Sequence, residues 1–158
     1  MKLWVVRLIL AGICLVARSV LAAPLAVGDL VPVISATDQQ GRAFNTTNGF
    51  EFLLVASEMA AAKSANQELA EQGAGYLEQH HAAYLLDIHP MPKIARFFAF
   101  PKMRKYPQRI ILVDAPGALA DFPARPGRVT VVAVTPDRRI KKISYWEPVS
   151  EPVAACFR

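Results

Sequence analysis

The sequence predicts an α/β domain whose mixed central β-sheet is flanked by helices and preceded by an N-terminal β-hairpin. Two continuous apolar runs, 52–57 and 83–88, are typical of strands covered on both faces, and each precedes a segment of helical character. A third run follows at 109–114, and the clearest hairpin spans 129–145. Strand–helix units followed by an antiparallel pair form a mixed sheet in three layers.

The first half of the domain contains a hairpin, a strand and a helix. Residues 30–35 and 42–44 flank the turn-rich segment 37–41, which predicts the hairpin. Residues 58–72 are rich in Ala, Glu, Lys and Gln, which favour a helix. Two glycines interrupt this helix, and a further turn is expected at 76–81.

The second half adds a helix at 92–105, bent or broken at Pro101, and a short C-terminal helix within 149–157. We expect the apolar side chains of the first of these helices to pack on the sheet and its many cations to face solvent. These apolar residues are Ile94, Phe97, Phe98 and Met103. Contact of this basic segment with an anionic membrane is the less favoured alternative.

The N-terminus has the order of a secretory signal peptide. Lys2 and Arg7 precede an apolar run at 8–17, and small residues follow, with cleavage expected after Ala22. The sequence therefore predicts a signal peptide at 1–22, a single domain at 23–158 and a periplasmic location. Removal of the three cations of the signal lowers the formal charge from +5 to +2, which argues against nucleic-acid binding.

Several local motifs resemble the thioredoxin-like superfamily. The segment Val-Gly-Asp-Leu-Val-Pro at 27–32, with Thr-Asp-Gln-Gln-Gly at 37–41, is similar to the opening of its periplasmic peroxiredoxin and thiol–disulfide reductase branch. Residues 113–120 look like the strand and turn inserted in that branch, and 130–140 match its closing hairpin. The resemblance implies a thioredoxin-like fold over most of the mature chain.

The residues that carry the chemistry of this superfamily are missing. Its two redox cysteines map to Met59 and Ala62, and its cis-proline maps to about Val129. Cys156 is the only cysteine after residue 22, and we expect it to have no function. The chain is therefore expected to be a degenerate member without dithiol activity, and no catalytic constellation or cofactor motif replaces the thiols.

The resemblance implies that the former redox face remains as a binding surface. We expect Met59, Ala62, Arg128 and Val129 to form it, with an extended polypeptide or another periplasmic protein as the non-covalent partner. Two alternatives stay open. One is a copper-binding protein that uses His89 and Met91, with Met59, because thioethers and imidazoles suit Cu(I). The other is an enzyme of unrecognised mechanism.

Overall fold

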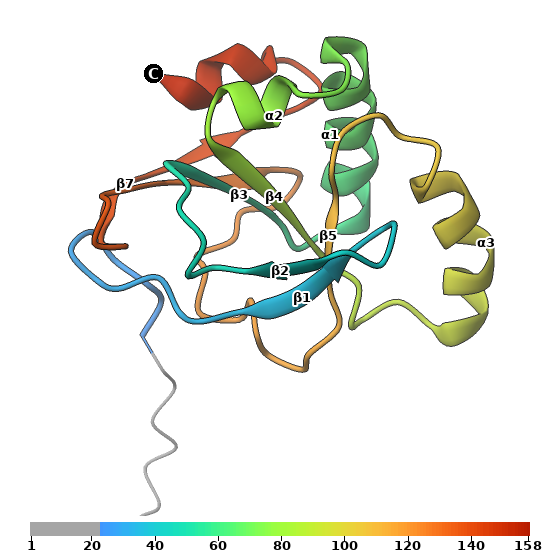
Figure 1. Ribbon diagram of the computed structural model, residues 1–158, viewed down its shortest axis with the longest axis horizontal. Helices are drawn as coiled ribbons and strands as arrows, with labels where there is room; N and C mark the ends of the chain where they lie inside the picture. Colours follow the sequence, from blue (N-terminus) through green and yellow to red (C-terminus); the bar gives the residue numbers. More distant parts are fainter. Residues whose placement is uncertain (1–22) are drawn as a thin grey trace, which may run out of the picture.

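Within residues 23–158, which the computed structural model describes, seven strands form one mixed sheet in the order β2-β1-β5-β4-β3-β6-β7 (Figure 1). The predicted signal peptide at 1–22 lies outside the described residues. No helix in the described part is long and apolar enough to cross a bilayer. The predicted mixed α/β sheet is confirmed.

The centre of the sheet is parallel. β3 (Phe52–Ala56) pairs with β4 (Ala82–Asp87), and β4 pairs with β5 (Ile111–Val113). The helix α1 (Met59–Gln72) connects the first two strands, and α3 (Lys93–Met103) connects β4 to β5. Both connections step in the same direction along the sheet. Right-handed crossovers therefore place α1 and α3 on the same face.

Antiparallel hairpins complete the two edges of the sheet. At one edge β1 (Ser35–Asp38) pairs with β2 (Ala43–Asn45) and also with β5. At the other edge β6 (Val129–Val134) pairs with β3 and with β7 (Ile140–Trp146). Both hairpins were predicted, although the first strand of the N-terminal one begins five residues later than its apolar pattern suggested.

Two short helices lie at one end of the sheet. Gly73 ends α1 with a φ of 86°, a left-handed conformation that glycine adopts without strain, and α2 (Tyr76–Gln79) follows. The C-terminal segment forms a 3₁₀ helix, η1 (Val153–Phe157). In Figure 1, α2 and η1 lie close together at the top of the molecule.

Buried side chains form two clusters, one on each face of the sheet. The first cluster includes side chains from α1, α2, α3 and η1. The second is closed by the segment before β1, with Val31 and Ile34, and by the loop after β5, with Leu119 and Phe122. Within residues 23–158, the members of both clusters lie between residues 25 and 157, so the described part of the chain holds a core on each face of the sheet.

The predicted inward face of α3 is wrong in three of its four residues. Ile94, Phe97 and Phe98 are 71%, 75% and 62% exposed, and only Met103 is buried. Instead, Ala95 and Ala99 pack with Met103 against the first cluster. These three residues recur every four positions and share one face of the helix. Pro101 lies inside α3 without ending it.

Candidate functional site

The turn between β3 and α1 is bonded to the turn before β6. Glu58 is the N-cap residue of α1, and its carboxylate Oε2 accepts a hydrogen bond from the backbone N–H of Gly127 at 2.8 Å. Gly127 is followed by Arg128 and by Val129, the first residue of β6. The two segments that the resemblance assigned to one face therefore meet at the start of α1.

The four residues predicted for this face differ in exposure. Met59 opens the first turn of α1 and is 51% exposed, whereas Ala62 and Val129 are buried. The side chain of Arg128 is part-buried and pairs with Glu147 at 3.0 Å. No cis peptide bond occurs in the described residues. Of the four, Met59 and Arg128 are therefore the ones that present side chains to solvent.

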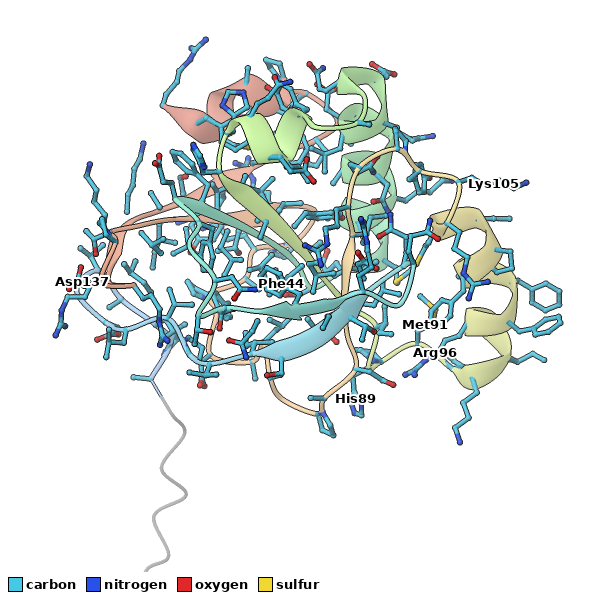
Figure 2. All side chains as sticks on the ribbon, in the orientation of Figure 1. Phe44, His89, Met91, Arg96, Lys105 and Asp137 are labelled. Atoms are coloured by element: carbon cyan, nitrogen blue, oxygen red, sulfur yellow. The ribbon has the colours of Figure 1, made fainter. Side chains whose placement is uncertain are left out.

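A methionine-lined groove runs between α1 and α3. It consists of two neighbouring clefts of about 260 and 420 Å³ that share Met59 and Ala99. Met91 lines the first cleft and Met103 the second, so each methionine of residues 23–158 contributes to the lining. Figure 2 shows Met91 between the sheet and α3. We call this feature the methionine groove.

The walls of the methionine groove are apolar and its rim is charged. Ala95 and Ala99 of α3 form much of one wall, and their small side chains leave the space that the groove occupies. Lys63 and Lys102 border the second cleft, and Asp87 borders the first. The groove can therefore accept apolar groups between charges of opposite sign.

The loop before α3 is held by one arginine. The Arg96 guanidinium bonds both carboxylate oxygens of Asp114, at 2.6 and 2.7 Å, and donates to the backbone oxygens of Ile88 and Met91. The hydrogen bonds from Arg96 lower the pKa of the Asp114 carboxyl. This clamp fixes the loop that supplies Met91 to the groove.

The histidines are not gathered into a metal centre. His89 is bonded through Nδ1 to the backbone oxygen of Asp114 at 3.1 Å and lies at the outer end of the molecule, whereas Met91 is buried in the groove (Figure 2). His80 stacks on Phe157 with ring centroids 4.2 Å apart. Among residues 23–158, no three His, Cys, Asp or Glu side chains are placed to share a metal ion.

Cys156 lies on η1, in the first buried cluster. Burial raises the pKa of its thiol to about 12, and the Glu151 carboxylate adds to the increase. A thiol of this kind is protonated at neutral pH and is a poor nucleophile.

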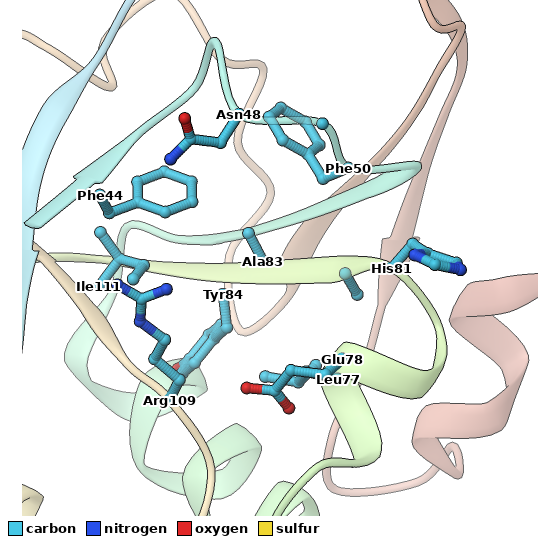
Figure 3. Close-up of a pocket in the computed structure, with 12 residues that line it drawn as sticks. Phe44, Asn48, Phe50, Leu77, Glu78, His81, Ala83, Tyr84, Arg109 and Ile111 are labelled. Atoms are coloured by element: carbon cyan, nitrogen blue, oxygen red, sulfur yellow. The ribbon is translucent and has the colours of Figure 1, made fainter.

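A second cavity, of about 270 Å³, was not expected from the sequence (Figure 3). It lies beside Ala82–Tyr84, the part of β4 that has no partner residue in the short strand β5. Arg109 borders it, but its guanidinium is already bonded to Asp38 and to the backbone oxygen of Ala43, both at 2.9 Å. The guanidinium of Arg109 is therefore already engaged within the fold.

No protein-family model and no curated protein matches the chain. Its fold is similar to that of the thioredoxin domain of a thiol-disulfide oxidoreductase from Bacteroides vulgatus, with a TM-score of 0.53 and 15% identity over 85% of this chain and 99% of that one. A peroxidoxin from Mycobacterium tuberculosis has a TM-score of 0.51 and 18% identity over 84% of this chain and 94% of its own. A peroxiredoxin-like protein from Aquifex aeolicus has a TM-score of 0.52 and 11% identity over 82% of this chain and 81% of its own.

Proposed function

From the thioredoxin-like fold that these likenesses show, we propose that the chain is an exported binding protein without dithiol redox activity. It holds a partner non-covalently in the methionine groove. The observation that carries the proposal is the position of this groove. It opens at the first turn of α1, beside Met59, where the resemblance places the first redox cysteine.

Side-chain chemistry supports the loss of thiol exchange. The thioether of Met59 and the methyl group of Ala62 form no mixed disulfide, and the thiolate is the reactive form of any cysteine. The thiol of Cys156 has a raised pKa and is buried on the inner side of η1, so it does not replace them. Binding through this face therefore needs no covalent step.

The lining of the groove suits an extended polypeptide with apolar side chains. Unbranched thioethers adapt to ligands of different shape, and Met59, Met91 and Met103 supply three of them. Lys102 at one end favours an acidic residue in the partner, and Asp87 at the other end favours a basic one. Val129, which the sequence had assigned to this face, is buried and takes no part.

Export is the second component of the proposal. It rests on the signal-like segment 1–22, with its basic start, apolar run and small residues. We expect the protein in a periplasmic extract to begin at Ala23. N-terminal sequencing of that fraction tests this, and recovery of the full chain in the cytoplasm alone would contradict it.

In-cell photo-crosslinking tests the binding face. A photoreactive residue replaces Met59 in one strain and Gln67 in another. Both positions are exposed on α1, but only Met59 lines the groove. We expect a discrete protein adduct from position 59 that is absent from position 67, and mass spectrometry then identifies the partner. No adduct at position 59, or the same adducts at both positions, would refute the proposal.

The substitution Met59→Asp separates lost binding from lost folding. A carboxylate in the first turn of a helix interacts favourably with the helix dipole, so α1 remains stable. The same carboxylate is unfavourable in an apolar groove. Affinity for the crosslinked partner is expected to fall at least about tenfold for Met59→Asp and to stay unchanged for Gln67→Asp.

A further inference from the structure

The outer face of α3 carries an exposed apolar stripe. Ile94, Phe97 and Phe98 are spaced i, i+3 and i+4, so they lie on one side of the helix. All three side chains are more than 60% exposed. The two phenyl rings pack edge to face, with their centroids 5.4 Å apart. This stripe faces away from the methionine groove, which is lined by Ala95 and Ala99.

The helix that presents this stripe is attached firmly at both ends. Arg96 bonds the Asp114 carboxylate and the loop before α3. After the helix, the side-chain amide of Gln40 donates to the backbone oxygen of Arg104 at 3.2 Å. The phenylalanines are therefore held outward on a fixed support. Their exposure does not come from a helix that has left the core.

The segment that carries the stripe is rich in cations, of which Arg96 and Arg109 are paired with Asp114 and Asp38 from outside the segment. Six cations and no acid fall between Ile88 and Val113, whereas the rest of residues 23–158 holds nine cations and thirteen acids. Lys93, Lys102 and Arg104 border a shallow hollow of about 640 Å³ that also contains both phenylalanines. Lys105 extends the cationic border beyond α3 (Figure 2). The cations that border this hollow thus surround the exposed rings of Phe97 and Phe98.

We propose that the outer face of α3 docks on an anionic phospholipid bilayer. Phenyl and branched alkyl groups enter the boundary between headgroups and acyl chains, where they need no hydrogen-bond partner. The surrounding lysines and arginines pair with lipid phosphates, and each contributes to attraction toward a negative surface. The docking surface shares only Lys102 with the methionine groove, and its test uses lipid without a protein partner, so it stands or falls independently of the proposed partner binding.

Vesicle flotation tests this docking. Residues 23–158, which carry both buried clusters, are mixed with vesicles of phosphatidylglycerol and phosphatidylcholine or of phosphatidylcholine alone. We expect the protein to float with the anionic vesicles and to stay in solution with the neutral ones. The bound fraction is expected to fall as salt rises from 0.05 to 0.5 M, roughly where surface charges become screened.

Two pairs of substitutions separate the apolar and electrostatic contributions. Phe97→Asp with Phe98→Asp is expected to abolish flotation. Lys102→Glu with Lys105→Glu is expected to lower the binding constant at least about tenfold. The charge-matched control is Lys141→Glu with Lys142→Glu, on exposed positions of β7, which is expected to bind within about twofold of the unmodified protein. Circular dichroism checks that each variant is folded.

Three results would overturn the proposal. The first is that the unmodified protein does not float with anionic vesicles. The second is that it floats equally well with neutral ones, or that the β7 control loses as much binding as the α3 pair. The third is self-association without lipid that Phe97→Asp and Phe98→Asp abolish, which would identify a second copy of the chain as the occupant of this face.

Discussion

The helices α1 and α3 cover the same face of the sheet but distribute their side chains in opposite ways. α1 buries Ala61, Ala65 and Leu69 and exposes polar residues such as Lys63 and Gln67. α3 packs on the core through Met103 and the partly buried Ala95, Ala99 and Phe100, whereas Ile94, Phe97 and Phe98 are in solvent. The first pattern is that of an ordinary amphipathic helix. In the second pattern, the helix contributes little apolar surface to the core although it contains several aromatic residues.

This difference indicates that α1 contributes mainly to stability and that the outer face of α3 is available for recognition. The inward side chains of α1 account for its place in the fold. The outer face of α3 has no such explanation, because exposed aromatic residues lower solubility and are uncommon unless they form a contact surface. The small inward residues of α3 also create the methionine groove. The outer stripe of α3 and the groove beside Ala95 and Ala99 are therefore the two parts of this helix that are available for binding.

The largest expected effect compares one apolar residue from each helix. Leu69→Ala leaves a cavity in the first cluster and is expected to lower the free energy of unfolding by about 2–5 kcal/mol. Phe98→Ala truncates a larger side chain that is already exposed to solvent, and it is expected to change the free energy of unfolding by about 0.5 kcal/mol or less. Denaturant unfolding of residues 23–158 measures both. A loss of more than about 2 kcal/mol for Phe98→Ala would show that α3 packs like α1.

An intermediate effect is expected at the turn next to the C-terminal end of α3. The buried carboxylate of Asp38 accepts hydrogen bonds from the Nε–H groups of Arg42 and Arg109, at 2.7 and 2.9 Å, and from two backbone N–H groups. Asp38→Asn loses both charge-assisted bonds and is expected to destabilise the fold by about 1–3 kcal/mol at pH 7. Denaturant unfolding measures this loss. A neutral result would mean that the bonds to the Asp38 carboxylate do not stabilise the fold.

The same residue predicts a pH dependence. Burial alone would raise the pKa of Asp38, but the bonds from Arg42, Gln40 and Arg109 lower it below its usual value of 3.8. The stabilisation is therefore present above pH 3.8 and is lost as the pH falls through the lower pKa of the folded protein. The difference in the free energy of unfolding between the original protein and Asp38→Asn should become smaller over that pH interval. A difference that stays constant with pH would contradict this assignment.

The smallest effect is expected at the loop that leads into α3. His89 bonds a backbone oxygen through Nδ1 and is half-exposed, whereas Met91 is buried in the groove. We expect His89→Ala to leave copper binding and the melting temperature unchanged. Elemental analysis of the protein purified in the presence of copper, before and after a chelator, measures this. Stoichiometric copper that His89→Ala removes would favour the metal-binding alternative instead.

The order of strands and helices along the chain was predictable from the sequence because the signals for the individual elements are local. Continuous apolar runs identified β3 and β4, and helix-forming residues identified α1 within one residue of its start. The face of α3 was not predictable in this way, because two stripes of the helix are apolar. Hydrophobicity favoured Ile94, Phe97 and Phe98, but the helix packs through Met103 and the partly buried Ala95, Ala99 and Phe100.

The candidate site was only partly predictable for the same reason. The position of Met59 at the start of α1 followed from the strand–helix boundary. The burial of Val129 depends on its pairing with Trp146 across β6 and β7, and hydropathy does not give the face on which a strand residue lies. The groove depends on the distance between α1 and α3. The small side chains of Ala95 and Ala99 set this distance, and the periodicity of the sequence does not predict it.

A disulfide-reduction assay tests the claim that this fold acts without thiols most directly. Residues 23–158 are compared with the variant Met59→Cys with Ala62→Cys, whose positions on successive turns of α1 suit a disulfide. The unmodified protein is expected to reduce insulin disulfides no faster than the reductant alone, and the variant is expected to be faster. Turnover by the unmodified protein that Cys156→Ser abolishes would contradict the account and make Cys156 the reactive group.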